Sequence, residues 1–508
     1  MRRGARYGIL ALAGAVGGCA VGPDYSPPQV PVAPAFDAKP SPGLTASEPQ
    51  SERWWEQFHD PVLDTLVARA DLQNLDLKRA VLAVETYRAQ YTVDFSKLFP
   101  DIETGGSYAR RRVDSNQLGV QNPDVLQRGF DTWQWTMAAA TWEIDVWGAV
   151  RRQIEAGVAT VQASAESYRA ALVSVRAEVA QAYMTLRQLQ AQQAAAMELV
   201  RGYDRLLAAV EKKVQQEVGS RVDLAQVRSR RSAVIGDAAR FDTQIAQQVS
   251  GIAILLGESP ANVRRMLEQR RPIPTVEVPV AVGVPSSLLL RRPDVRAAER
   301  RVQAATAGIG VAEAGYLPRF TFTGNFIIQA PQLSGLGNVS DNQTYVVNPA
   351  ISWNFMNILT GATEATVIQA KAQAADALLQ YQIAVVAAVN QVEAAISSFG
   401  AAARTRASYR DASTSISQAY ALALQQYDAG TIDITALITY LQAMLTAQDG
   451  LAQAEGLVAQ NYVALYRSLG GGWENSPMPM QVEETKRFNP TPTANDFLAD
   501  DSAKKNQG

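Results

Sequence analysis

The second half of this 508-residue chain repeats the plan of its first half. Each half has a short helical segment, a proline break, a stretch in which polar and aromatic residues alternate, and a tryptophan. A very long helical stretch follows and reverses at a glycine. The corresponding positions are Trp142 and Trp353 (353 − 142 = 211), Gly219 and Gly430 (430 − 219 = 211), and Phe99-Pro100 and Leu317-Pro318 (317 − 99 = 218). Repetition on this scale predicts two copies of one folding unit and an assembly built by symmetry.

The composition argues against most catalytic systems. With one His and one Cys, the chain offers no His-Cys metal cluster and no intrachain disulfide, and nucleophile systems that need His are disfavoured. The nearest approach to a nucleotide-binding glycine motif, Gly308-Ile309-Gly310, lacks the third glycine. A net charge of −2 gives no basic field for nucleic acid. Carboxylate- or lysine-based chemistry remains open, but we predict no catalytic residue, metal or cofactor, and hence no enzyme.

The single cysteine, Cys19, lies in a targeting sequence. Three arginines within the first six residues precede the apolar run 7–16, which is too short to span a bilayer but fits a signal peptide. The sequence Val16-Gly17-Gly18-Cys19 resembles a bacterial lipobox, which predicts cleavage after residue 18 and acylation of Cys19. Ala20, in place of Asp, favours the outer membrane by resemblance to sorted lipoproteins. The alternative is a chance buried cysteine. The proline-rich segment 19–52 is expected to be an extended, acylated tether.

The stretch from Trp147-Gly148 to Gly219 has no proline and a helical repeat. Its apolar residues recur at alternating steps of four and three, which is the 3.5-residue period of left-handed coiled coils. Glycine supplies the left-handed backbone that ends a helix, so Gly219 and Gly430 are expected to do so here. Long helices are therefore predicted at about 147–218, 221–256, 361–429 and 432–469. A rod-like coiled-coil scaffold remains the alternative, whereas the Ala- and Gln-rich second faces favour a closed ring of helices.

Between each proline break and each tryptophan the period changes to two, which predicts strands at about 102–113, 130–142, 319–328 and 343–355. Aromatic residues alternate with polar ones: Phe320, Phe322 and Phe326 against Thr321, Thr323 and Asn325, and Trp133, Trp135 and Met137 against Gln134, Thr136 and Ala138. This alternation is typical of transmembrane barrel strands, and a soluble hairpin is the alternative. The lipobox and the absence of a recognised transmembrane helix favour the barrel. Pro349 implies an edge strand or a bulge.

Four strands leave two unpaired edges, which a bilayer does not tolerate. A closed barrel needs about eight strands or more. The chain is therefore expected to share a barrel with other copies of itself, so oligomerisation is a physical requirement of this interpretation.

Three blocks of sequence carry a resemblance to a known family. They are Trp54–Phe58 with Asp60–Leu63, Trp142–Gly148, and Leu290–Arg300, which contains Arg291, Arg292, Pro293 and Asp294. In order and spacing the chain resembles the TolC-like outer-membrane factors, in particular the lipoprotein branch with OprM- and NodT-type channels. The resemblance extends from the lipobox to about Trp473. We take the four residues from Arg291 to Asp294 as a structural motif, since proline and an acidic residue suit a helix start.

The resemblance implies an α+β membrane protein that forms a homotrimer. A 12-stranded outer-membrane barrel would continue into a long periplasmic α-helical barrel with a mixed equatorial domain. The implied function is the passive exit duct of a tripartite efflux pump, which conducts small toxic compounds from a periplasmic adaptor and an inner-membrane transporter of the resistance-nodulation-division class. The runner-up is a periplasm-spanning structural coiled-coil lipoprotein without a lumen. The expected parts are a signal peptide (1–18), the acylated segment (19–52), a first repeat (53–260), a linker (261–285), a second repeat (286–472) and a polar tail (473–508).

In this family the gate lies at the periplasmic tip, where the helices reverse. The resemblance places the gate candidates at Asp223, Gln426, Tyr427 and Asp433. Tyr427 matches a tyrosine whose hydrogen bonds hold the tip shut, and Gln426 replaces the arginine often found before it. Three copies of Asp223 and Asp433 near an axis would form acidic rings that hold cations; the alternative is that both carboxylates only cap helices. The family's inner acidic position is Thr439 here.

Overall fold

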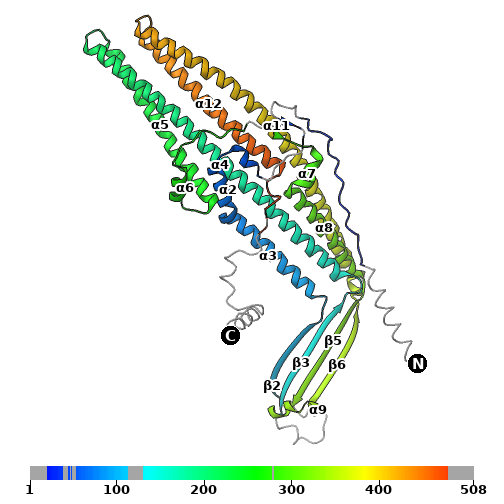
Figure 1. The fold of residues 1–508 in the computed structure, drawn as a ribbon. Coiled ribbons are helices and arrows are strands. Elements are labelled where there is room, and N and C mark those ends of the chain that lie inside the picture. The colour runs from blue at the N-terminus through cyan, green and yellow to red at the C-terminus, as the bar shows by residue number, and fades with distance from the viewer. Residues whose placement is uncertain are drawn as a thin grey trace, which may run out of the picture. The chain divides into compact units, whose positions relative to one another are not determined.

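The computed structural model describes residues 20–37, 44–45, 47, 53–111, 130–276, 280–476 and 478 (Figure 1). The chain forms two compact units, which we call the sheet unit and the helical unit. The sheet unit takes residues 1–28, 86–163 and 298–381, and the helical unit takes 29–85, 164–297 and 382–508. The signal peptide, Cys19 and the end of the polar tail lie outside the described residues.

The sheet unit contains four antiparallel strands in the order β2-β3-β5-β6 (Figure 1). Their bounds are β2 Asp101–Arg111, β3 Phe130–Ile144, β5 Arg319–Ala330 and β6 Gln343–Ser352. Pro349 lies in β6, opposite Phe322, and β6 is an edge strand of this sheet. A proline is tolerated there because an edge strand has one side without ladder partners.

The pairing register gives the sheet one apolar and one polar face, because directly opposed residues project to the same side. The apolar face carries Ile102, Trp142, Ile144, Phe320, Phe322, Phe326, Tyr345, Val347 and Ile351. The polar face carries Asp101, Thr141, Glu143, Arg319, Thr321, Thr323, Asn325, Asn348 and Ser352. Large apolar side chains are exposed on this sheet, with Tyr345 at 73% and Ile351 at 69%. An exposed aromatic face is the pattern expected of strands that face lipid.

A bulge corrects the simple alternation predicted for the second strand. In β3 the register shifts between Thr136 and Ala138, so that Ala138 pairs with Phe326. Ala138 therefore lies on the apolar face, whereas the period-two pattern grouped it with Gln134 and Thr136. An extra residue in one strand moves every later side chain to the other face.

The long helices occur as two hairpins, α4 with α5 and α11 with α12 (Figure 1). Helices α4 (Ala149–Gln215) and α11 (Ala362–Asp428) have 67 residues each, and α5 (Arg221–Leu256) and α12 (Ile434–Leu469) have 36 each. The other helices are η1 Trp54–Phe58, α2 Pro61–Gln73, α3 Leu75–Ser96, α6 Pro260–Leu267, α7 Pro285–Arg291, α8 Pro293–Glu313, η4 Ala314–Tyr316, η5 Leu333–Gly337, α9 Val339–Asn342 and α10 Phe355–Leu359. A short parallel pair joins β1 (Leu44–Thr45) to β4 (Val280–Ala281).

Aromatic residues concentrate in the core of the helical unit. Trp54 stacks on Tyr466 with ring centroids 5.7 Å apart, and Phe58 meets Tyr462 edge-on at 5.0 Å. Burial and the neighbouring Tyr466 raise the pKa of Tyr462. Aromatic pairs of this geometry contribute beyond their buried area, so the Trp54-Trp55 block is part of the core.

The internal repeat reappears as a pair of matching hydrogen bonds in the sheet unit. The Trp142 indole N–H donates to the Leu98 carbonyl at 3.0 Å, and the Trp353 indole N–H donates to the Tyr316 carbonyl at 3.0 Å. The two acceptors are 316 − 98 = 218 positions apart, which is the offset of the two proline breaks that follow them. The same side chain therefore fixes the same turn in both copies.

The first helix reversal corrects the role given to Gly219. The residue in the left-handed region is Glu217, with φ 60°, and Val218 N–H donates to the Lys213 carbonyl at 3.1 Å. Gly219 is instead needed for space, since an added Cβ would lie 2.8 Å from the Val214 nitrogen. For Gly430 the prediction is confirmed: it has φ 75° just after α11.

By length and apolar composition alone, one described helix, α11, passes the test for a membrane span. Buried helices of soluble proteins pass the same test, and 39% of the apolar window in α11 is buried. This result does not show that α11 spans a membrane. It does mean that the lack of a transmembrane helix can no longer be used to argue for a barrel, so that argument depends on the two-faced sheet.

Candidate channel wall and gate

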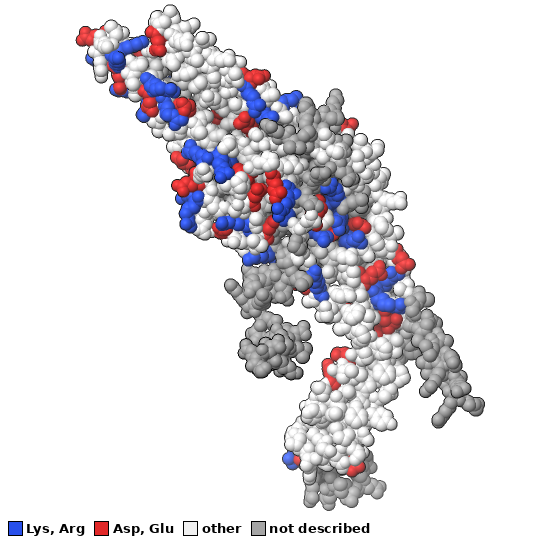
Figure 2. All heavy atoms as spheres, viewed as in Figure 1, with Lys and Arg blue, Asp and Glu red and all other residues white. Residues whose placement is uncertain are grey.

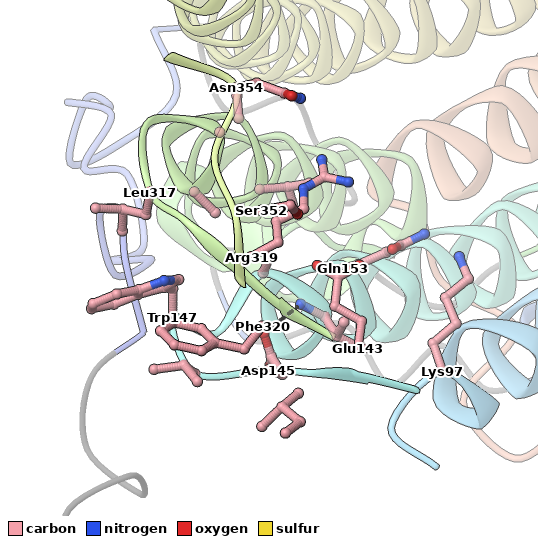
Figure 3. Close-up of a pocket in the computed structure, with 18 of the residues that line it drawn as sticks. Lys97, Glu143, Asp145, Trp147, Gln153, Leu317, Arg319, Phe320, Ser352 and Asn354 are labelled. Carbon is pink, nitrogen blue, oxygen red and sulfur yellow. Dashed lines mark hydrogen bonds between the residues drawn. The ribbon is translucent and has the colours of Figure 1, made fainter. Parts of the chain in front are cut away.

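A recess of about 1150 Å³ lies in the sheet unit, where β3, β5 and β6 meet the first turns of α4 and α11 (Figure 3). Its charged lining residues are Lys97, Asp101, Glu143, Asp145 and Arg319. Glu143 is paired with Thr321 and Arg319 with Ser352, so the register places both on the polar face of the sheet. The recess is therefore a water-compatible surface with charges of both signs.

Two of these charged groups are committed to structure. Asp145 accepts hydrogen bonds from Val150 N–H at 3.1 Å and Arg151 N–H at 3.0 Å, so it caps the start of α4. Lys97 pairs with Asp94 at 2.7 Å.

The side chains of Asp101, Glu143 and Arg319 have no hydrogen-bond or ion-pair partner within the described part of the chain, and all three residues are exposed. They are the charges of the recess that remain available to water or to a passing solute. The described residues also contain no group of three or more His, Cys, Asp or Glu that could hold a metal.

The Arg291–Asp294 motif has structural contacts in the helical unit. The Arg292 guanidinium is buried and donates to the Ser468 carbonyl at 2.8 Å and to Gln391 Oε1 at 2.9 Å. It also donates to both carboxylate oxygens of Asp294, at 3.0 and 2.7 Å. Pro293 is the first residue of α8, where a missing N–H costs little. These contacts support the structural role that we propose for the motif.

A cluster around Trp473 was not predicted from the sequence. The guanidinium carbons of Arg169 and Arg296 lie 4.9 and 5.1 Å from the Trp473 ring centroid. Both arginines also pair with Glu166 Oε1 at 2.6 Å. Arg296 lies within the Leu290–Arg300 block, but a partner at position 473 leaves no local signal. Cation–π contacts of this kind contribute ~0.5–2 kcal/mol each.

At the second helix reversal, Tyr427 is buried, with 8% of its surface exposed. Its ring packs in a cluster with Tyr203, Val227 and Ile434, and Lys213 Nζ lies 4.1 Å from the ring centroid. Within the described residues the Tyr427 hydroxyl has no hydrogen-bond partner. The hydrogen-bonded latch stays a prediction for the assembled tip, and within one chain the Tyr427 ring packs between α11 and α4.

The other gate candidates lie at helix starts and in the turn. Asp433 accepts a hydrogen bond from Ala436 N–H at 2.7 Å and is the N-cap of α12, which is the alternative that the sequence left open. Asp223 is in the first turn of α5 and is partly exposed. The Gln426 side chain is exposed, while its carbonyl accepts from Thr431 N–H and Oγ1, both at 2.9 Å. A capping carboxylate keeps its charge, so capping and an acidic ring are compatible.

The two hairpins differ in charge although they repeat one fold. Residues 201–231, around the first reversal, carry eight basic and four acidic residues (8 − 4 = +4), and the corresponding residues 412–442 carry none and two (0 − 2 = −2). Figure 2 shows charged side chains gathered over α4 and α5, whereas the end of the α11–α12 hairpin and the sheet are mostly uncharged.

An amphipathic sheet with two open edges, a polar recess and helices of 67 residues define the subunit of a membrane channel. The family model of the outer membrane efflux proteins matches residues 66–258 and 284–471, more than half of the chain. The chain belongs to the outer membrane efflux protein family, and the predicted resemblance is confirmed.

Individual relatives agree with this assignment. The solved outer-membrane channel OprN is 31% identical, with a TM-score of 0.80, over 90% of this chain and 100% of that one. The probable efflux pump outer membrane protein TtgC of Pseudomonas putida is 29% identical over 465 residues, which cover 90% of this chain and 93% of the relative. The Campylobacter jejuni channel CmeC, at 20% identity and a TM-score of 0.82, shows the fold alone. The protein is thus an outer-membrane exit duct of an efflux pump.

Proposed function

We propose that three copies of this chain close one 12-stranded barrel in the outer membrane, continued by a helical barrel in the periplasm. The observation that carries the proposal is the four-stranded sheet with one apolar and one polar face and open edges at β2 and β6. Such edges need partners in a bilayer. Three sheets of four strands supply a barrel above the minimum of about eight, and the polar faces with Glu143 and Arg319 line its lumen.

The duct works with a periplasmic adaptor and an inner-membrane transporter of the resistance-nodulation-division class, which supplies the energy. The chain itself conducts passively and catalyses no reaction. Its cargo is small toxic organic compounds, since relatives are named for efflux of toluene and antibiotics and for export of pyoverdine. The two structural repeats, 53–260 and 286–472, supply equivalent staves of the periplasmic barrel.

The periplasmic gate lies at the helix reversals and uses Tyr427, Gln426, Asp433 and Asp223. The buried Tyr427 ring orders the α11–α12 reversal, and the carboxylates of Asp433 and Asp223 form acidic rings around the threefold axis. Because Gln426 has no charge, the closed tip has one ionic latch fewer than the arginine-bearing members of the family. The Arg291–Asp294 motif lies outside the conduction path and stabilises the helical unit.

The test is single-channel recording of the purified trimer in planar bilayers, with and without opened tips. We expect discrete conductance that rises when Tyr427→Leu removes the ring at the reversal. Tyr440→Leu is the matched control, because Tyr440 lies in α12 with 40% of its surface exposed. A structural brace without a lumen would never conduct, even with the tip opened, and that result would overturn the duct.

The lipid anchor is a separate proposal. Cys19→Ser is expected to abolish fatty-acid labelling and signal-peptide removal, because the lipobox thiol is the acylation site. The barrel inserts by itself, so part of the activity should remain. Equal fatty-acid labelling of wild type and variant would refute the proposed lipid anchor and would leave the proposed channel function unaffected.

A further inference from the structure

The residues just after Cys19 are held in place by the sheet unit. Val21 N–H donates to the Trp147 carbonyl at 3.0 Å. Arg152, only 5% exposed, donates from Nε to the Val21 carbonyl at 3.1 Å and from Nη2 to the Gly22 carbonyl at 3.2 Å. The same Nη2 donates to Asp24 Oδ1 at 2.7 Å. A buried guanidinium that serves three acceptors on one short segment is a built clamp, since burying an unpaired charge is costly.

Glycines allow this segment to approach its neighbours. Gly22 has φ +94°, and a Cβ there would lie 2.3 Å from Gly310 Cα. A Cβ on Gly310 would lie 2.5 Å from the Val21 carbonyl oxygen, and one on Gly148 would lie 2.8 Å from Ala20 Cα. Most of these are backbone atoms, which cannot rotate away as a flexible side chain can. The slot is therefore fitted to Ala20–Gly22, and any side chain in it would expel the segment.

A further contact fixes the end of the segment. The Tyr25 hydroxyl donates to Glu299 Oε1 at 2.9 Å, and burial together with this carboxylate raises the pKa of Tyr25. A tyrosine hydroxyl is protonated at physiological pH, and the raised pKa keeps this one protonated and donating at higher pH as well. Ala20–Tyr25 is held at both ends, by α4 and by α8.

We propose that Ala20–Tyr25 is a strap that locks the lipid-bearing end of the chain into a slot formed by Gly148, Arg152 and Gly310. Arg152 is the positioning residue of the anchor. The inference rests on the proposed acylation of Cys19, which precedes Ala20 by one residue, or ~3.8 Å of chain. The strap holds Ala20 and Val21, which follow the acylation site, beside the junction at Trp147, where the strands give way to α4, and it does so even without lipid.

Hydrogen exchange of the full-length trimer tests the strap. Because Cys19→Ser also keeps the signal peptide, we would follow the peptide of residues 20–28 in protein whose residues 1–19 are replaced by a leader that is cleaved without acylation. Protection is expected to persist in this unacylated protein and to fall about tenfold or more when Gly310→Ala or Arg152→Gln is added. Gly308→Ala is the matched control, because Gly308 lies in the same helix and a Cβ there meets nothing within 4 Å.

A second variant guards against misfolding of α8. Gly22→Ala changes the strap alone, and it should also abolish protection of 20–28 while peptides from α8 and β5 keep theirs. Equal protection of residues 20–28 in Gly310→Ala, Gly22→Ala and Gly308→Ala would overturn the strap. Failure of the lipid anchor shows elsewhere, in the fatty-acid labelling of Cys19→Ser.

Protease accessibility gives a second, independent readout. If strap and lipid both hold the N-terminus, a protease site placed within residues 29–37 should be cut slowly in the unacylated protein and in Gly310→Ala alone. The double variant should be cut about tenfold faster than either, because the second restraint is then also lost. A cleavage rate in the double variant that only equals the sum of two small single-variant increases would contradict the proposed strap.

Discussion

Replacing Arg292 by alanine should strongly destabilise the helical unit without changing conduction. The variant removes the donor of a buried hydrogen bond to the Ser468 carbonyl at the end of α12 and of a part-buried one to Gln391 in α11. A buried hydrogen bond from a charged group contributes ~1.5–3 kcal/mol and the part-buried one adds less, so we expect a loss of ~2–4 kcal/mol per protomer. The Asp294 side chain is 46% exposed, so that ion pair adds at most ~1 kcal/mol.

The neighbouring arginine provides a matched comparison. Arg291 lies 3.6 Å from Glu474, with both side chains partly exposed, so Arg291→Ala is expected to cost ~1 kcal/mol or less. Arg292→Lys should fall between the two, because an ammonium group lacks the planar fork that meets several acceptors.

The assay is the half-time of thermal unfolding in detergent, followed by tryptophan fluorescence. Large oligomers often unfold irreversibly, so a rate is the proper measure. Trp473 reports locally, since its indole N–H donates to the Arg291 and Gly470 carbonyls. If Arg292→Ala unfolds no faster than Arg291→Ala, the stabilising role of Arg292 is refuted. Altered conductance at unchanged stability would indicate that Arg292 lies on the conduction path.

Three further outcomes are expected. Asp433→Asn should keep the N-cap of α12 but weaken block of the channel by divalent cations. Asp433→Ala should also lose ~1 kcal/mol of capping and raise the open probability. Identical single-channel traces for the two variants would show that Asp433 serves only as a helix cap. Glu217→Gly should stabilise the first reversal by up to ~1 kcal/mol, because Glu217 has φ 60°, and slower unfolding of an α4–α5 probe would show it. Burial, followed by Glu56 and Asp60, raises the pKa of Asp64 above 3.8. The folded state therefore holds this proton more tightly than the unfolded state does, so the protonated carboxyl stabilises the fold at low pH, and this stabilisation is lost as the pH rises through the raised pKa. Asp64→Asn should stabilise the protein near pH 7 and should match wild type below pH 3.8. A stabilising effect that persists in acid would contradict this.

Local patterns in the sequence carry much information about the helices and strands. The expected helix at about 221–256 has the bounds of α5, and the expected strand at about 343–355 overlaps β6, Gln343–Ser352. Periodicity and proline or glycine breaks act over a few residues, so one sequence displays them. The aromatic face of β5 follows from the same period-two pattern.

Contacts between distant residues could not be predicted in this way. Arg292 donates a hydrogen bond to the carbonyl of Ser468, 176 positions away in the sequence, and only the folded structure shows that the two groups are neighbours. The bulge at Met137 depends on the register with β5, and a strand read alone keeps strict alternation. The left-handed residue at the first reversal is Glu217, although glycine at 219 gave the stronger local signal.

The two repeats are alike at the strand–helix junction and in the lengths of their long helices, and they differ in charge at the helix reversals. Trp142 and Trp353 make equivalent hydrogen bonds at the strand–helix junction, and the paired helices have equal lengths. At the reversals the charge changes from +4 over residues 201–231 to −2 over residues 412–442. Six hairpins from three chains would then alternate basic and acidic ends around the tip. In such an arrangement the basic and acidic ends of neighbouring hairpins would attract one another. A docking adaptor would then meet two kinds of hairpin end, whereas six identical hairpins would present only one kind.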